Sequence, residues 1–111
     1  MEKKNIDWSS LGFGYVQTDL RFVSNFKDGA WDEGCLTKDA NIVMNECAGV
    51  LQYAQTCFEG MKAYRKPDGS IQLFRPDMNA KRTNATNDRL VIPQLPEEDF
   101  VQAVSAVVDV D

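Results

Sequence analysis

A four-residue turn at positions 66–69, K-P-D-G, constrains the fold of this chain more than any other short segment. Proline presets the first turn angle and glycine tolerates a positive φ, so the chain is expected to reverse direction here. The runs 58–65 and 70–75 on either side are long enough to pair as antiparallel strands. The turn therefore predicts a β-hairpin in the middle of the chain.

Side-chain alternation along the two strands assigns their residues to opposite faces of the hairpin. Met61 and Ala63 on the first strand share a face, and Ile71 and Leu73 on the second strand do as well. These four apolar side chains are predicted to form the buried side of the pair. The neighbouring side chains then point the opposite way: Phe58, Gly60, Lys62 and Tyr64.

Two helices are expected after the hairpin. Pro76 suits the first position of a helix, where no amide donor is needed, and this helix is predicted to run to about Leu90. Prolines then break the chain, and the acidic run 97–99 marks the start of a second helix because negative charge is favourable there. Its predicted apolar face consists of Phe100, Val101, Val104, Val107 and Val108.

Shorter elements are expected upstream of the hairpin. Residues 20–26 have a strand-like pattern, and the turn at 27–29 predicts that they form a hairpin with residues 30–31. Residues 41–44 predict another short strand, and residues 47–56 a loop or short helix. Together the elements predict an α+β fold, a two-layer domain over residues 1–111 with helices on one face of an antiparallel sheet.

The composition argues against several classes of function. The formal net charge of −5 opposes nucleic-acid binding, which needs clustered lysine and arginine in excess. Neither a membrane-spanning run nor a secretory signal is evident, so a cytoplasmic protein is expected. The three cysteines have no metal-binding or disulfide pattern, and no metal site is expected. The absence of histidine removes the usual general base.

Two clusters have alternative interpretations. Arg75, Arg82 and Arg89 recur every seven residues, and such a stripe is either an anion site or a solvated helix face balanced by acidic neighbours. Tyr53, Phe58 and Tyr64 surround Gly60 in sequence and indicate either the wall of a ligand pocket or an ordinary packed aromatic cluster. Lys62 either contacts an anion or is solvated.

A long ordered series of segments resembles one enzyme family. The stretch L-Q-Y-A-Q-T-C-F-E-G-M-K-A-Y at 51–64, then S-I-Q-L-F-R-P-D-M-N-A-K-R at 70–82 and R-L-V-I-P at 89–93, closely resemble branched-chain aminotransferases. These are pyridoxal-phosphate enzymes of fold type IV. The upstream segments 11–19 and 27–34 resemble the same family, so nearly the whole chain is covered. The chain departs from many relatives at Gln52 and Ala54.

The resemblance implies specific roles. Arg82 matches the residue that binds the phosphate of pyridoxal 5′-phosphate, whereas Arg75 and Arg89 have no such counterpart. A permanently charged, fork-shaped donor suits a phosphate group. Four residues match or adjoin family positions that line the substrate side-chain pocket: Tyr53, Phe58, Gly60 and Lys62.

The resemblance also implies what this stretch lacks. The Schiff-base lysine of the family is expected beyond Asp111, in a second domain, and none of the lysines in the chain matches it. The chain is therefore expected to be the N-terminal small domain of a homodimeric transaminase, inactive and without retained cofactor on its own. The expected reaction exchanges the amino group of leucine, isoleucine or valine with 2-oxoglutarate. Three alternatives are a D-amino-acid aminotransferase, an aminodeoxychorismate lyase and a non-catalytic binding module.

Overall fold

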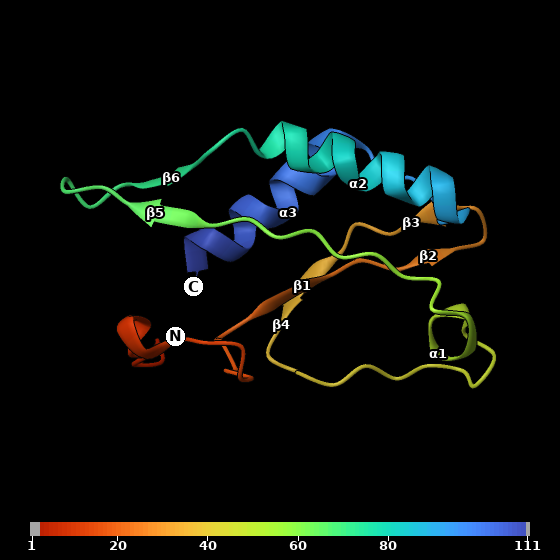
Figure 1. The fold of residues 1–111 in the computed structure, drawn as a ribbon, viewed down its shortest axis with the longest axis horizontal. Helices are drawn as coiled ribbons and strands as arrows, with labels where there is room; N and C mark the ends of the chain where they lie inside the picture. Colours follow the sequence, from red (N-terminus) through yellow and green to blue (C-terminus); the bar gives the residue numbers. More distant parts are fainter. Residues whose placement is uncertain (1–2, 111) are drawn as a thin grey trace.

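The computed structural model describes residues 3–110 and has an α+β architecture, which confirms the predicted fold class. The chain combines short strands with one short and two long helices (Figure 1). In chain order the elements are η1 (Trp8–Ser10), β1 (Arg21–Val23), β2 (Phe26–Lys27), β3 (Ala30–Trp31), β4 (Cys35–Thr37), α1 (Gly49–Tyr53), β5 (Ala63–Arg65), β6 (Ile71–Leu73), α2 (Pro76–Leu90) and α3 (Glu97–Val110).

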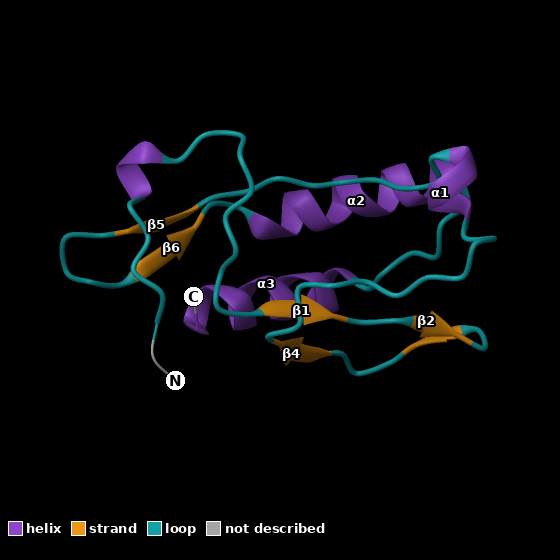
Figure 2. Cartoon of the chain, turned by 90° about the horizontal axis from the view of Figure 1, so that it is seen from below, coloured by secondary structure: helices purple, strands orange, loops and turns teal. Residues whose placement is uncertain are grey.

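The strands of the described residues form three separate antiparallel pairs, β1–β4, β2–β3 and β5–β6. The antiparallel sheet expected from the sequence is thus divided into three two-stranded sheets within residues 3–110. Helix α3 packs against α2 and also against β1, so it lies between the other helix and a strand pair (Figure 2). The layers therefore form around α3, with α2 on one side and the β1–β4 pair on the other.

The central hairpin is confirmed, with shorter strands than the pattern suggested. Ala63 pairs with Leu73 and Arg65 with Ile71, and Gly69 in the turn has a φ of 90°. The hairpin projects from the body of the molecule (Figure 1). Ala63 and Ile71 are therefore exposed, and of the face predicted to be buried only Met61 and Leu73 are half-buried.

The second hairpin is also confirmed at its turn. Asp28 and Gly29 both have positive φ, 53° and 82°, the geometry of a tight two-residue turn that matches the twist of its strands. The rings of Phe26 and Trp31 meet edge to face across this hairpin, with centroids 5.3 Å apart. The strand expected at 41–44 is wrong, because that extended segment has no partner strand within the described residues.

The two long helices begin and end close to their predicted positions. Pro76 occupies the first turn of α2, and the helix ends where Val91 adopts a left-handed conformation and its N–H bonds to the carbonyls of Asn87 and Asp88. Helix α3 begins with three acidic residues, 97–99. The predicted apolar residues of α3 are all half-buried, as expected for a face that packs on α2 and β1.

Little of the described chain is fully enclosed. Ala80 is the one fully buried hydrophobic residue among those described, and Asn87 is the one buried polar residue. The radius of gyration is 15.5 Å, whereas a compact domain of this length has about 13 Å. None of the described helices is long and apolar enough to cross a membrane.

Candidate functional site

The segment 55–62 runs along α2 in an extended conformation (Figure 1). The amide of Gln55 donates a hydrogen bond of 3.0 Å to the carbonyl of Leu90 at the C-terminal end of the helix. Two residues later, the sulfur of Cys57 lies 3.0 Å from the side-chain oxygen of Asn87. The odd positions of the segment thus face the helix, and the even positions face away.

The next odd position, Glu59, reaches Arg82 in the middle of α2. The Nε of Arg82 donates a hydrogen bond of 3.0 Å to Oε2 of Glu59, and its Nη2 donates to Oε1 of the same carboxylate. Asn79, one turn earlier on the helix, donates a hydrogen bond of 2.8 Å to Oε1. The carboxylate therefore accepts three hydrogen bonds from one helix face, two of them from a guanidinium fork.

The two members of this ion pair differ in exposure. The side chain of Arg82 is 67% exposed, whereas that of Glu59 is only 11% exposed. The hydrogen bond from Arg82 lowers the pKa of Glu59 below its usual value, and the same contact raises the pKa of Arg82. Both groups are therefore charged at neutral pH, with the acid on the inner side and the base facing solvent.

Arg82 also lines an open cavity of about 410 Å³ together with Met78, Asn79 and Lys81. This volume lies within the range of small-molecule sites. Its two cationic side chains, Lys81 and Arg82, are donors suited to an anion rather than to a metal ion. Residues 3–110 contain no group of three or more acidic or thiol side chains placed to hold a metal.

The four residues predicted to bind substrate lie in two places. Phe58, Gly60 and Lys62 share the outward face of the extended segment, and Phe58 is 94% exposed. Tyr53 lies on α1 and is 86% exposed. Phe58 and Gly60 flank Glu59 directly, so the open face and the Arg82 contact belong to one segment. Tyr53 and Phe58 lie outside the cavity beside Arg82.

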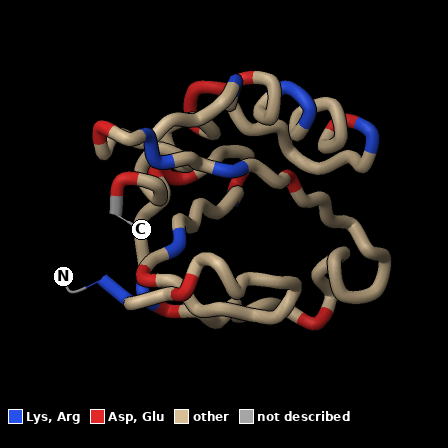
Figure 3. The backbone as a smooth tube through the Cα atoms, turned by 60° about the vertical axis from the view of Figure 1, so that its left-hand side comes forward, with Lys and Arg blue, Asp and Glu red and all other residues tan. Residues whose placement is uncertain are grey.

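Of the other two arginines of the sevenfold pattern, Arg75 lies before α2 and only Arg89 lies on the same helix as Arg82. Arg75 precedes the helix in a left-handed conformation, with φ 47° and ψ 55°. Arg89 lies in the last turn of α2, where a cation is favourable beside the helix carbonyls. Acidic and basic positions alternate along the helical side of the molecule, as Figure 3 shows.

Sequence reasoning missed two members of this cluster, Glu59 and Asn79. Their contacts join residues that are distant in sequence: Glu59 bonds to Arg82, 23 residues later, and Asn79 bonds to Glu59, 20 residues earlier. One signal was available: strand alternation in segment 55–62 places Glu59 on the face opposite Phe58.

The fold and this cluster define an α+β polypeptide in which an arginine of α2 is paired with a carboxylate beside an open cavity. Comparison with known proteins goes further. The chain is 53% identical over 105 residues to a branched-chain-amino-acid aminotransferase of Haemophilus influenzae and 44% identical over 105 residues to that of Helicobacter pylori. It is 39% identical over 110 residues to the branched-chain-amino-acid transaminase 1 of Bacillus subtilis.

These matches cover 95%, 95% and 98% of this chain, but in each case only 31% of the relative. No protein-family model matches the chain. The chain is homologous to the N-terminal part of a branched-chain-amino-acid aminotransferase.

Proposed function

We propose that this chain forms part of a pyridoxal-phosphate-dependent transaminase, in which Arg82 binds the phosphate of the cofactor. The substrates proposed are leucine, isoleucine or valine as amino donor and 2-oxoglutarate as acceptor. One observation carries the proposal: a solvent-facing guanidinium on α2, beside an open cavity, in a chain homologous to branched-chain-amino-acid aminotransferases.

The residues present suit the phosphate group. Glu59 engages Nε and Nη2 of Arg82, which leaves the Nη1 side of the fork for a second anion. Lys81 borders the same cavity and adds a second charged donor. Asn79 also borders it, but its side-chain amide already donates to Glu59 and Gly60. Bound pyridoxal phosphate supplies the aldehyde that accepts the amino group and the ring that withdraws electrons from the substrate.

The outward face of segment 55–62 is the proposed substrate wall. Phe58 offers an exposed aromatic surface to an aliphatic side chain, and Gly60 allows close approach to the backbone. Lys62 follows on the same face and is exposed. Tyr53, on α1, is proposed to complete the wall once the surrounding protein covers these residues.

The catalytic lysine is proposed to come from a second domain. The large exposed apolar side chains of this chain, including Phe13, Val43, Phe58 and Phe74, are surfaces that another domain or a second subunit of a homodimer would cover. On its own, the 111-residue chain is expected neither to transaminate nor to yield a cofactor-modified lysine after borohydride reduction.

A chimera tests the proposal directly. This chain replaces the matching 105 residues of the Haemophilus influenzae relative, so that the relative supplies the remaining 69% or so of the protein. We expect the chimera to bind pyridoxal phosphate and transaminate leucine. Arg82→Ala should weaken cofactor binding about 10- to 100-fold, the value of a charge-assisted contact. Arg89→Ala on the same helix is the matched control and should leave the affinity unchanged.

The alternatives give different outcomes in the same assays. Turnover of D-alanine or aminodeoxychorismate in preference to leucine would assign the chain to a different enzyme of fold type IV. A chimera that folds but binds no cofactor would favour a non-catalytic binding module. Equal cofactor affinity in the wild type and Arg82→Ala would remove Arg82 from its proposed role.

A further inference from the structure

Glu59 is the most enclosed charged side chain of the candidate site, at 11% exposure, and the proposed reaction assigns it no task. Enclosing a carboxylate is unfavourable unless hydrogen bonds compensate for the lost water. Here the three donors come from Arg82 and Asn79. The carboxylate is therefore held by the two residues that also line the anion cavity.

The orientation of the guanidinium follows from this pairing. Glu59 takes Nε and one proton of Nη2, which is the side-on edge of the fork. The end-on edge, formed by Nη1 and the second proton of Nη2, makes no hydrogen bond within residues 3–110. Because the guanidinium is planar and rigid, fixing one edge also fixes the direction of the other.

Asn79 joins the same cluster to the backbone of the substrate wall. Its Nδ2 donates 2.8 Å to Oε1 of Glu59 and 3.2 Å to the carbonyl of Gly60. The hydroxyl of Thr83 donates back to the carbonyl of Asn79 within α2. The helix that presents Arg82 and the segment that presents Phe58 and Gly60 are therefore connected through one carboxylate and one amide.

We propose that Glu59 is a positioning residue for phosphate binding: it holds the Arg82 guanidinium so that the end-on edge faces the anion cavity, and with Asn79 it fixes that edge relative to the Phe58–Gly60 wall. This inference rests on the proposed function, because the anion it serves is the cofactor phosphate. Glu59 itself touches neither the phosphate nor the substrate.

A competing role for Glu59, as an internal anion that occupies the phosphate position, disagrees with the exposures. A displaceable carboxylate would lie on the solvent side of Arg82, where an incoming phosphate approaches. Glu59 instead lies on the enclosed side, and Arg82 is six times more exposed than its partner, 67% against 11%. Glu59 thus holds the guanidinium from the enclosed side and leaves the solvent-facing side open to an anion.

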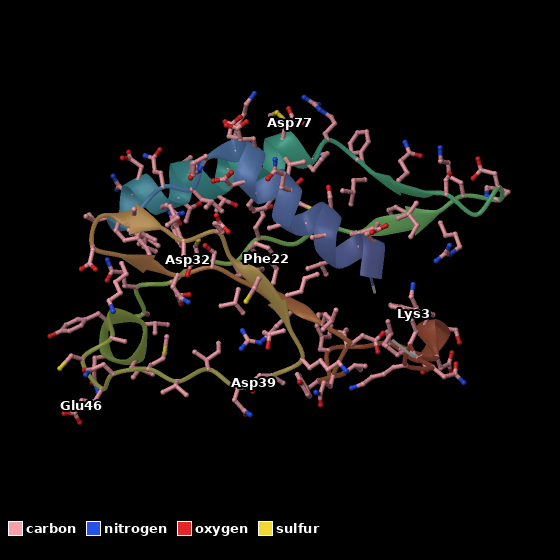
Figure 4. All side chains as sticks on the ribbon, turned by 180° about the vertical axis from the view of Figure 1, so that it is seen from behind. Lys3, Phe22, Asp32, Asp39, Glu46 and Asp77 are labelled. Atoms are coloured by element: carbon pink, nitrogen blue, oxygen red, sulfur yellow. The ribbon has the colours of Figure 1, made fainter. Side chains whose placement is uncertain are left out.

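The test uses the chimera described above and measures cofactor affinity by equilibrium dialysis. Glu59→Gln keeps the shape of the side chain and removes its charge. We expect it to weaken binding of pyridoxal phosphate about tenfold, which corresponds to roughly 1.4 kcal/mol. Glu59→Asp retains the charge and should recover part of the loss. Glu46→Gln is the matched control, because Glu46 is exposed and lies beside α1, away from the start of α2 at Asp77 (Figure 4).

Three further measurements separate positioning from structural damage. Pyridoxal lacks the phosphate, so its affinity should be unchanged by Glu59→Gln. In an Arg82→Ala background, Glu59→Gln should cause no additional loss, because Glu59 acts through Arg82. In the 111-residue chain itself, the Nε–H signal of Arg82 in a nitrogen–proton NMR spectrum should exchange with water faster in Glu59→Gln.

Specific outcomes overturn the inference. Tighter binding of pyridoxal phosphate in Glu59→Gln would make the carboxylate a competitor, and an equal loss for pyridoxal would make its role purely structural. If Glu59→Gln weakens pyridoxal phosphate binding as much in the Arg82→Ala background as in the wild type, Glu59 does not act through Arg82. If the affinity depends on Arg82 but not on Glu59, only this inference fails; if pyridoxal and pyridoxal phosphate bind equally tightly to the intact chimera, the proposed function fails.

Discussion

Gly34, between β3 and β4, is a position where a single methyl group should cause a large loss of stability. Its φ is 74°, a left-handed conformation that side-chain-bearing residues rarely adopt. A Cβ built there would lie 2.4 Å from Cζ and 2.6 Å from Cε1 of Phe22, and 3.1 Å from the backbone oxygen of Val23. The ring of Phe22 would have to move, and it borders the cavity between β1 and α3.

The structure supplies a matched control for the size of this effect. Gly69 also has a positive φ, 90°, but a Cβ there has no neighbour within 4 Å. Gly69→Ala therefore carries only backbone strain, about 1–2 kcal/mol, offset by about 0.4–1 kcal/mol from the stiffer unfolded chain. Gly34→Ala has the same backbone strain and the same offset from the unfolded chain, and the contact with Phe22 adds about 1–3 kcal/mol of overpacking. The difference between the two variants isolates the clash with Phe22.

Urea denaturation followed by tryptophan fluorescence measures this difference. Trp31 is half-buried and its indole N–H donates 2.9 Å to the carbonyl of Gln94, so its emission reports unfolding. We expect Gly34→Ala to unfold at clearly lower urea than Gly69→Ala, and Phe22→Leu to restore part of the loss in the Gly34→Ala background. Equal midpoints for the two alanine variants would refute the reasoning.

Two further predictions concern the site. Phe58→Ala should change the free energy of unfolding of the chain by less than about 0.5 kcal/mol because the ring is almost fully exposed, while raising KM for leucine in the chimera; an unchanged KM would exclude Phe58 from the substrate wall. The Glu59 carboxylate has a lowered pKa, so its stabilising contribution is complete above the unfolded value of about 4.5 and is lost as pH falls through the lower folded value. The difference in melting temperature between the wild type and Glu59→Gln should therefore be constant near neutral pH and shrink below about pH 4.5; a difference that grows in acid would contradict the pairing.

The helices could be predicted because their signals are local. Pro76 and the acidic run 97–99 mark helix starts through interactions within one turn, so nothing distant has to be known. The strand at 41–44 failed for the opposite reason. Its apolar pattern suits a strand, but a strand also needs a partner, and the described part of the chain provides none there.

The contrast between local signals and distant contacts also explains which parts of the candidate site could be predicted. The role of Arg82 is a prediction from resemblance, and strand alternation predicts the outward face of Phe58, Gly60 and Lys62. The contact with Glu59 could not be anticipated, because it depends on how a segment 23 residues earlier lies against α2. Ion pairs between distant segments leave no periodic trace in a sequence.

The register of segment 55–62 on α2 connects these observations. Gln55, Cys57 and Glu59 each bond to the helix at progressively earlier positions, so three contacts fix one alignment. A shift of one residue would exchange the two faces, placing Phe58 on the helix and Glu59 in solvent. Arg82, the proposed phosphate anchor, would then lose the support of Glu59, and the proposed substrate wall would lose its aromatic surface. The proposed cofactor anchor and the proposed substrate wall thus depend on the same set of contacts along α2.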